Sequence, residues 1–163
     1  MIRTDNLTKR YRHNKALHDL TLDVPPSSVF ALVGPNGTGK STAIKIVMNL
    51  IRPNAGCAEV FGVDSTRLGA AELAQIGYVS ENQRLPEWMR VDYFLKYCRA
   101  FYPSWDSALA AELISQYELP LDRRLGALSR GMKVKAALAV SLAYRPRLIV
   151  LDETFSGLDV LVS

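Results

Sequence analysis

The sequence has few cysteines and no long uncharged apolar run. Its two cysteines, Cys57 and Cys98, lie far apart in a spacing that does not suit a metal site. They indicate a reducing compartment with thiols that are buried or unused. The longest uncharged apolar stretch, residues 136–144, is far shorter than the roughly 20 residues of a membrane-spanning helix. The first residues are charged and polar and lack the apolar segment of a signal peptide. We therefore expect a cytoplasmic protein that reaches a membrane only through a partner.

The charge balance is only mildly basic. The 163 residues carry 20 Lys and Arg against 16 Asp and Glu, a formal charge of +4. Because the basic residues form no dense run with interleaved aromatic residues, an ordinary solvated surface is favoured over a nucleic-acid groove. A contact with a membrane face fits the same charge equally well. With 48% hydrophobic residues, the chain has the size and composition of one globular domain.

Strand and helix patterns occupy different parts of the chain. Apolar runs and alternations predict strands at residues 2–7, 17–24, 29–33, 57–62, 76–80 and 148–151. The run at residues 29–33, VFALV, has the pattern of a central buried strand. Helical periods predict helices at residues 41–51, 70–75, 91–102, 105–117 and 129–143. The sequence thus predicts an α/β domain in which strand-rich segments, residues 1–85 and 146–163, enclose a helical lobe at residues 86–145.

A glycine-rich loop between the predicted buried strand and the next helix carries the strongest chemical signal. Its sequence, GPNGTGKS, fits the pattern G-x-x-x-x-G-K-[ST]. The glycines allow backbone N–H groups to turn toward phosphate oxygens, and the helix N-terminus adds partial positive charge. Lys40 is then expected to bridge the β- and γ-phosphates of ATP, Ser41 to bind Mg²⁺, and Thr42 to donate to the α-phosphate. The alternative is a glycine-rich turn with a chance Lys-Ser pair. The candidate nucleotide-binding residues of this loop are Gly34, Pro35, Asn36, Gly37, Thr38, Gly39, Lys40, Ser41 and Thr42.

An acidic pair follows the last predicted strand, in the segment RLIVLDE. A carboxylate at the C-terminal end of a buried parallel strand lies in the ligand crevice of such a sheet. Asp152 is then expected to bind Mg²⁺, directly or through water, and Glu153 to act as general base on the attacking water. Taken alone, such a pair also suits the N-cap region of a helix. The phosphate loop upstream favours the metal site.

The order of the motifs is more informative than any one of them. LSRGM, at residues 128–132, begins a predicted helix with Ser129 as its natural N-cap, and in isolation it indicates only a capped helix. Along the chain, however, the phosphate loop is followed by the helical lobe, LSRGM, RLIVLDE and then SGLD at residues 156–159. This ordered set resembles the ABC ATPases over essentially the whole chain. The resemblance implies a P-loop NTPase fold, with a RecA-like parallel sheet core, N-terminal antiparallel strands and an inserted helical subdomain.

The resemblance also implies partners. In that family two cassettes pair head to tail, and the signature motif of one closes over the ATP held by the other. Ser129, Arg130 and Gly131 would thus serve the partner's nucleotide. Tyr11 matches the aromatic residue that stacks on adenine, although a strand-end tyrosine packed on the sheet is the alternative. Asp159 matches the aspartate that links the two sites across the dimer.

By the same resemblance, the chain is an ATPase that uses Mg²⁺, with Lys40 and Glu153 as its catalytic residues. Hydrolysis would drive transport through a separate transmembrane permease, with the cassette bound to the inner face of the cell membrane as a homodimer or heterodimer and with no nucleic acid among its partners. An aromatic series of the helical lobe, Trp88, Tyr93, Phe94 and Tyr97, lies where the family docks a cytoplasmic helix of the permease. The alternative is lobe core, which we expect for at least half of these four residues.

The motifs depart from the family's pattern at several positions. Glu81 stands where the family usually has a Gln that contacts Mg²⁺ and the water, with Gln83 two residues further on. Relatives of the drug-resistance exporter kind tolerate Glu there. Arg130 and Met132 replace a Gly and a Gln of the signature, and Thr154 replaces a Pro. The Glu81 change matters most, because an acidic side chain near the metal and the γ-phosphate alters the local charge.

The family also has a switch histidine on a strand beyond the SGLD motif. The only histidines, His13 and His18, precede the phosphate loop. We therefore expect one partial ABC ATPase domain over residues 1–163 that is C-terminally incomplete, as a natural truncation, a frameshifted product or a fragment. A single cassette without sustained heptads favours a transporter subunit over a soluble ABC ATPase of the translation-factor or DNA-repair kind. The missing histidine leaves open an ATP-binding module with little hydrolysis.

Overall fold

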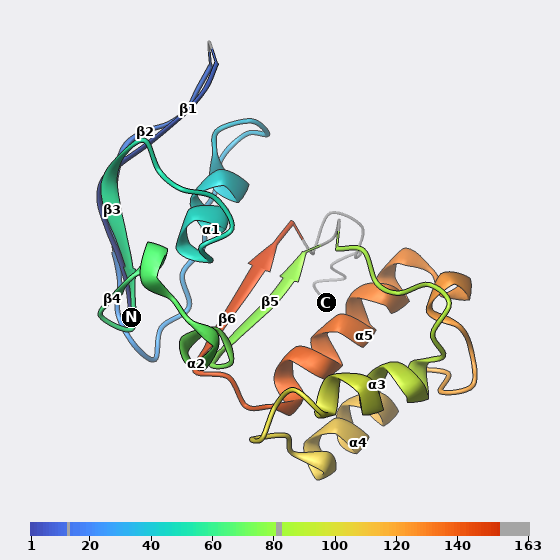
Figure 1. The fold of residues 1–163 in the computed structure, drawn as a ribbon. Helices are drawn as coiled ribbons and strands as arrows, with labels where there is room; N and C mark the ends of the chain where they lie inside the picture. Colours follow the sequence, from blue (N-terminus) through green and yellow to red (C-terminus); the bar gives the residue numbers. More distant parts are fainter. Residues whose placement is uncertain (13, 81–82, 154–163) are drawn as a thin grey trace, which may run out of the picture. The chain divides into compact units, whose positions relative to one another are not determined.

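The computed structural model describes residues 1–12, 14–80 and 83–153 and divides the chain into two compact units, Met1–Leu73 and Ala74–Ser163 (Figure 1). The architecture is mixed α/β, with antiparallel N-terminal strands and a parallel strand pair. None of the helices in the described ranges combines the length and the apolar character needed to span a bilayer. The sequence-based division into a core and a helical lobe at residues 86–145 stays a prediction.

The first unit is built on a four-stranded antiparallel sheet with the order β2-β1-β3-β4. The central strand β1 (Ile2–Tyr11) pairs with β2 (Asn14–Val24) on one side and with β3 (Ala55–Val60) on the other. Helix α1 (Lys40–Val47) contacts β2 and β3 and buries Ala43, Ile46 and Val47. The remaining elements are β4 (Val63–Asp64), the 3-10 turn η1 (Ser65–Arg67) and the short helix α2 (Ala70–Leu73).

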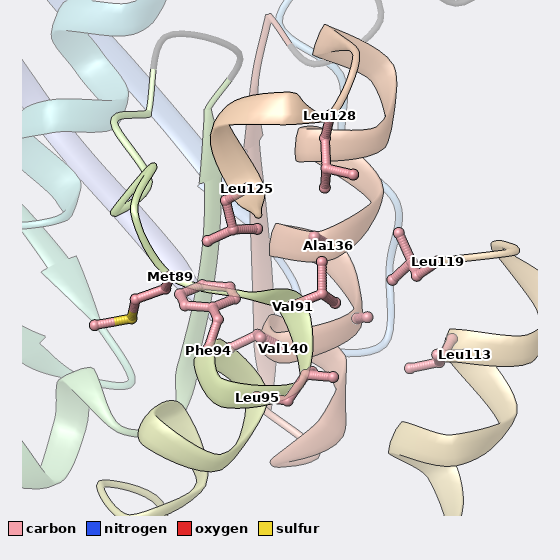
Figure 2. Packing of buried hydrophobic residues seen from close by; sticks show 11 residues of the cluster. Met89, Val91, Phe94, Leu95, Leu113, Leu119, Leu125, Leu128, Ala136 and Val140 are labelled. Carbon is pink, nitrogen blue, oxygen red and sulfur yellow. The ribbon is translucent and has the colours of Figure 1, made fainter. Parts of the chain in front are cut away.

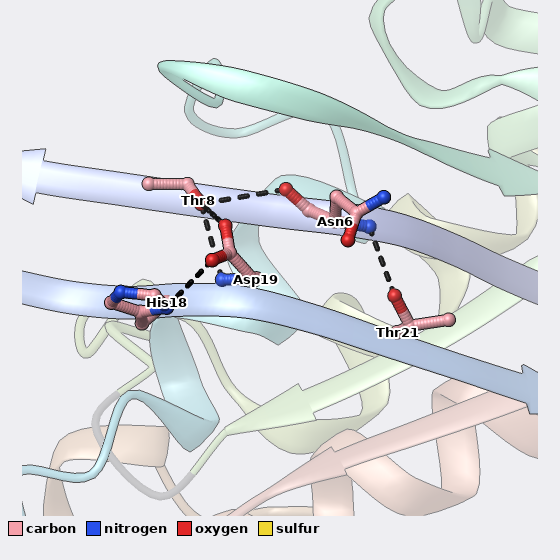
Figure 3. A network of polar contacts seen from close by, with 5 residues as sticks. All are labelled: Asn6, Thr8, His18, Asp19 and Thr21. Carbon is pink, nitrogen blue, oxygen red and sulfur yellow. Dashed lines mark hydrogen bonds and ion pairs between the residues drawn. The ribbon is translucent and has the colours of Figure 1, made fainter.

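Threonine side chains form hydrogen bonds across the irregular part of the β1–β2 pair, where the strand register shifts (Figure 3). Asn6 and Asp19 have positive φ angles of 46° and 47°, and the strand register shifts around them. Thr8 Oγ1 donates to Asp19 Oδ1 at 2.8 Å and accepts from the Asp19 N–H at 3.1 Å, while His18 Nδ1 lies 2.8 Å from Asp19 Oδ2. The Asn6 N–H donates to Thr21 Oγ1 at 3.0 Å. These side chains thus satisfy backbone groups that a bulged ladder leaves unpaired.

The second unit packs helices against two parallel strands. β5 (Ile76–Ser80) pairs in parallel with β6 (Leu148–Asp152). The described part of the connection between them contains three helices and a 3-10 turn, because a parallel pair requires a long crossover. These are α3 (Val91–Arg99), α4 (Ser107–Gln116), η2 (Leu125–Ala127) and α5 (Arg130–Ala143). Helix α5 covers one face of the strand pair, where Val134 and Ala137 pack against Val79.

The core of the helical part takes side chains from loops as well as from helices (Figure 2). Two polar contacts fix the start of α4 and the end of α5 beside this core. Asp106 caps α4 by accepting from the N–H groups of Ala108 and Leu109 at 2.9 Å each, and its Oδ2 lies 2.7 Å from Arg145 Nη2, just after α5. Tyr144 Oη donates to the Ile76 carbonyl at 2.9 Å and so joins the end of α5 to β5. The buried cluster comprises Met89, Val91, Phe94, Leu95, Leu113, Leu119, Leu125, Leu128, Ala136, Ala139 and Val140.

The predicted helices are all present, and so are all but one of the predicted strands. The exception is residues 29–33, for which the prediction of a buried strand is wrong. The structure assigns no strand there, and Val29, Phe30 and Val33 are exposed. A strand exists only where a neighbouring strand completes its hydrogen bonds, and no described segment pairs with this one. The apolar composition of residues 29–33 favours burial, but it does not identify a strand that would pair with them.

Both cysteines are free thiols. Cys98 on α3 is half-buried, and burial raises the pKa of its thiol to about 11. Such a thiol stays protonated at neutral pH and is a poor nucleophile. Cys57 lies exposed on β3. The expectation of a buried thiol therefore suits Cys98, whereas Cys57 is a surface residue.

Candidate nucleotide-binding site

The loop of residues 34–39 surrounds the ammonium group of Lys40, the residue that follows it. Lys40 is the first residue of α1. Its Nζ donates to the carbonyl oxygens of Gly34 at 2.7 Å and Pro35 at 2.8 Å. Thr38 Oγ1 also donates to the Pro35 carbonyl, at 2.9 Å. The loop therefore holds a positive charge within its own curve, at the start of a helix.

Two glycines give the loop its path. Gly37 and Gly39 have φ angles of 86° and 93°, in the left-handed region that side chains disfavour. Gly39 also lies against β2, where an added Cβ would overlap the carbonyl oxygen of Ala16 and lie 2.7 Å from Leu17 Cδ2. The loop thus sits on β2 at a distance that only glycine allows.

The first turn of α1 supplies hydrogen-bond donors. The N–H groups of a first helical turn point out along the helix axis and carry partial positive charge, and no side chain caps this end of α1. The hydroxyl-bearing residues Ser41 and Thr42 lie in the same turn and are half-buried. This combination of N–H groups, hydroxyls and the Lys40 ammonium suits the oxygens of a phosphate chain.

Tyr11 lies at the end of β1 in the same unit. Its side chain is 46% exposed, so the ring is not packed into the sheet. Lys9 Nζ lies 5.3 Å from the ring centroid, within the range of a cation–π contact. The ring offers an aromatic surface on which a base could stack. Its role with adenine stays a prediction.

The acidic pair belongs to the second unit. Asp152 ends β6 and is only 5% exposed, and Tyr78 Oη lies 3.5 Å from its Oδ2. Burial is the main cause that raises the pKa of Tyr78; a hydrogen bond with Ser80 opposes this rise, and the nearby Asp152 charge adds to it. Its hydroxyl therefore keeps its proton and faces the carboxylate as a donor. Glu153 is exposed and has a φ of 55°, a left-handed conformation that costs roughly 1–2 kcal/mol and is often found at functional sites.

Sequence reasoning did not identify Tyr78. The signal for it lies in strand pairing, because a parallel ladder brings side chains of β5 beside those of β6. That pairing joins residues 72 positions apart in the chain, such as Ser80 and Asp152. Motif spacing cannot supply such a register.

The LSRGM segment begins α5 as expected. Ser129 is the N-cap, and its Oγ accepts from the Met132 N–H at 3.2 Å. Arg130 is exposed. An added Cβ at Gly131 would meet nothing within 4 Å. The backbone at the start of α5 is therefore open to a ligand at Gly131.

The donor types fit Mg²⁺. The Ser41 hydroxyl and the buried Asp152 carboxylate are hard oxygen ligands of the kind that Mg²⁺ takes together with phosphates and water. Within residues 1–12, 14–80 and 83–153, no three His, Cys, Asp or Glu side chains gather as a metal cluster. A metal held partly by nucleotide phosphates does not need such a cluster. The other predicted metal ligand, Glu81, lies outside the described residues, as do Thr154 and Asp159.

Known proteins match nearly the whole chain. The family model for ABC transporters matches residues 17–156. The sulfate/thiosulfate import ATP-binding protein of Yersinia pseudotuberculosis is 33% identical over 170 residues, which cover 99% of this chain and 47% of that protein. The daunorubicin/doxorubicin resistance ATP-binding protein of Streptomyces peucetius is 36% identical over 163 residues, which cover 97% and 49%. The chain therefore spans about half the length of these relatives.

A solved structure gives the same result. The ATP-binding cassette MJ0796, described as a dimer in a post-hydrolysis state bound to ADP and Pi, superposes with a TM-score of 0.82 at 25% identity. The match covers 98% of this chain and 77% of that one. The family match, the relatives and the phosphate loop lead to one conclusion: the chain belongs to the ABC transporter family of ATP-binding proteins.

Proposed function

We propose that this chain is the nucleotide-binding subunit of an ABC transporter. It binds Mg-ATP and hydrolyses it at a head-to-tail dimer interface, and this drives transport through a separate membrane partner. The observation that carries the proposal is the loop of residues 34–39, closed on Lys40 at the start of α1. Glycines with positive φ, a helix N-terminus and a lysine inside the loop form an arrangement that suits the β- and γ-phosphates of a nucleotide.

Lys40 exchanges partners when the nucleotide binds. Its ammonium group leaves the carbonyl oxygens of Gly34 and Pro35 and contacts the β- and γ-phosphates. The exchange is favourable because a hydrogen bond between an ammonium group and a charged oxygen is about twice as strong as one to a neutral carbonyl. Thr42 donates to the α-phosphate, and Tyr11 stacks on the adenine.

The remaining residues of the proposed site bind the metal and activate the attacking water. Ser41 and Asp152 hold Mg²⁺, with Glu81 as a further oxygen ligand. Bound Mg²⁺ neutralises charge on the phosphates. Glu153 follows the buried strand end and accepts a proton from the attacking water as general base. Its exposed side chain reaches solvent, from which that water comes.

A second cassette completes each site. The Ser129 hydroxyl accepts from the Met132 N–H, and this leaves its own proton available for a phosphate oxygen on the partner. The open backbone at Gly131 and the cationic side chain of Arg130 add to this donor surface. The partner is another copy or a related cassette, and the dimer described for MJ0796 supports such an assembly. Asp159 is assigned the link between the two sites.

The docking surface for the membrane partner is an exposed aromatic face on α3 and the turns beside it. The aromatic face consists of Trp88, Tyr93, Tyr97 and Phe101, which are 67%, 52%, 47% and 61% exposed. The Trp88 and Tyr93 ring centroids lie 6.3 Å apart, and those of Tyr97 and Phe101 lie 5.1 Å apart. Phe94, the remaining member of the predicted series, is the one that is buried in the core, so the expectation that at least half of the series is core is wrong.

Exposed aromatic groups of this kind mark interaction sites, where Trp and Tyr contribute most of the binding energy. The occupant is a cytoplasmic helix of a transmembrane permease, which places the chain peripherally on the inner face of the cell membrane. The importer and drug-resistance relatives support a transport role. One alternative is a soluble ABC ATPase, which would not dock a permease helix on the aromatic face. The other is an ATP-binding module with little hydrolysis. Steady-state phosphate release would distinguish this module from an active ATPase.

The test of the proposed function is isothermal titration with Mg-ATP. Lys40→Ala removes the only cation inside the loop, and we expect binding to weaken by roughly 10- to 100-fold, because a hydrogen bond to a charged group contributes about 1.5–3 kcal/mol. Lys45→Ala changes an exposed lysine on the same helix and is the matched control. It should bind ATP like the wild type. Wild-type affinity in the Lys40 variant would overturn the assignment of the loop.

A further inference from the structure

Tyr78 lies on the same sheet face as the buried carboxylate of Asp152. In the parallel pair, Tyr78 is opposite Val150 and Ser80 is opposite Asp152. Because side chains alternate along a strand, Tyr78, Ser80 and Asp152 point to one face. Val79 points to the other face, which α5 covers. The phenol and the carboxylate therefore share the face that α5 does not cover.

The length of a tyrosine side chain matches the separation along the strands. Two residues of a parallel strand advance about 6.6 Å, and side chains on a strand lean along its direction. The Tyr78 ring thus carries its hydroxyl from the middle of β5 to the end of β6, where Oη lies 3.5 Å from Asp152 Oδ2. This is longer than an ideal O–H···O bond, but it remains within hydrogen-bonding distance.

We propose that Tyr78 is a positioning residue for Asp152. Its hydroxyl holds carboxylate oxygen Oδ2 and restricts rotation of the group that would bind the metal of Mg-ATP. The inference rests on the proposed function, because the orientation of Asp152 has a consequence only if Asp152 binds the metal. Hydrogen bonds that orient a metal ligand typically strengthen metal binding by about 10- to 100-fold. Phenylalanine at this position would fill the same space without the donor.

Ser80 extends this arrangement by one group. It lies opposite Asp152 in the strand register, and its hydroxyl opposes the rise in the pKa of Tyr78. The three side chains form a short polar series, from Ser80 through Tyr78 to Asp152, in which each hydroxyl constrains the next group. Ser80→Ala should therefore weaken metal binding in the same direction as Tyr78→Phe, but by less.

The experiment separates metal binding from nucleotide binding. ATP affinity is measured by titration calorimetry in Mn²⁺ and again in EDTA, and the ratio of the two affinities gives the gain due to the metal. We expect Tyr78→Phe to reduce this gain by about tenfold and to leave the affinity in EDTA unchanged. Electron paramagnetic resonance of the bound Mn²⁺ should show an altered spectrum in the same variant. Tyr117→Phe, which removes a hydroxyl from a half-buried tyrosine at the end of α4, is the matched control and should change neither quantity.

A double-mutant cycle assigns the effect to Asp152. In an Asp152→Asn background, Tyr78→Phe should have no further effect on the metal gain. An unchanged gain in Tyr78→Phe would overturn the inference, and so would an equal loss of affinity in Mn²⁺ and EDTA, which indicates a structural role only. If Tyr78→Phe does not fold, Ser80→Ala provides the same comparison, with a reduced gain as the supporting result. Failure of the wild-type protein to bind ATP under either condition would instead overturn the proposed function itself.

Discussion

Gly39 of the phosphate loop and Ala16 of β2 lie so close together that no side chain fits between them. An added Cβ on Gly39 would overlap the Ala16 carbonyl oxygen, and the φ of Gly39 is 93°. The nucleotide loop is therefore supported by β2, a strand of the antiparallel sheet, as well as by its own helix.

Gly39→Ala should destabilise the protein more than Gly62→Ala. Both glycines have positive φ, 93° and 82°, so both substitutions carry the left-handed penalty of roughly 1–2 kcal/mol. At Gly62 an added Cβ meets nothing within 4 Å, whereas at Gly39 it also overlaps backbone. Thermal unfolding without nucleotide measures the difference, at about 2–4 °C per kcal/mol for a chain of this size. Equal losses in the two variants would show that the contact with Ala16 relaxes easily.

Glu153→Gln should separate ATP binding from hydrolysis. The amide keeps the shape of the side chain but cannot accept the proton of the attacking water, and loss of a general base typically slows a reaction by about 10²- to 10⁴-fold. Glu118→Gln is the matched control, because Glu118 is also exposed and has a similar φ of 53° against 55°. Phosphate release under saturating Mg-ATP gives the rate, and calorimetry gives the affinity. A hydrolysis rate equal to that of the Glu118 variant would remove Glu153 from the mechanism.

The features that sequence alone predicted are those that depend on neighbours in the chain. The helix that follows the glycine-rich loop, the N-cap at Ser129 and the apolar periods of α3, α4 and α5 are local patterns, and the structure confirms them. Residues 29–33 show the limit of this reasoning, because an apolar run predicts burial but not the strand that must pair with it. The proximity of Tyr78 to Asp152 and of Gly39 to Ala16 depends on packing between distant segments, and no spacing in the sequence indicates either contact.

The link between Asp106 and Arg145 should make part of the stability depend on acid pH. The pKa of Asp106 is lowered, first by the hydrogen bond from the Leu109 N–H and then by Arg145. A carboxylate whose pKa falls on folding stabilises the native state at pH values above its unfolded pKa, about 3.9, and this contribution is lost as the pH falls through the folded pKa.

Asp106→Asn tests this link, because Asn caps a helix about as well as Asp but carries no charge for Arg145. The thermal midpoint of the wild type should exceed that of the variant at pH 7, and the gap should shrink as the pH falls below about 4. Asp122→Asn makes the same charge change at an exposed position and should show a smaller gap at pH 7. A gap that stays constant with pH for Asp106→Asn would mean that the charge contributes nothing.

Polar substitutions on the aromatic face should release the chain from membranes without unfolding it. Tyr97 and Phe101 are 47% and 61% exposed, so a double change of both residues to Ser removes little buried apolar area and should leave the thermal midpoint near that of the wild type. Docking, in contrast, uses the rings directly, and aromatic anchors at interfaces often contribute about 2 kcal/mol or more each. Leu121→Ser is the matched control, because Leu121 is also a large exposed apolar residue, 42% exposed, but lies outside the aromatic face.

The measurement is the fraction of the chain that sediments with native membranes, together with cross-links from residues near α3 to an integral membrane protein. A drop in both for the Tyr97 and Phe101 variant, but not for Leu121→Ser, is the result expected of a permease-docking surface. The membrane-bound fraction should fall by roughly tenfold or more, since 1.4 kcal/mol corresponds to a factor of ten in an equilibrium constant. Unchanged sedimentation of a correctly folded double variant would show that the aromatic face does not hold the protein at the membrane. The soluble ABC ATPase would then be the better assignment for this chain.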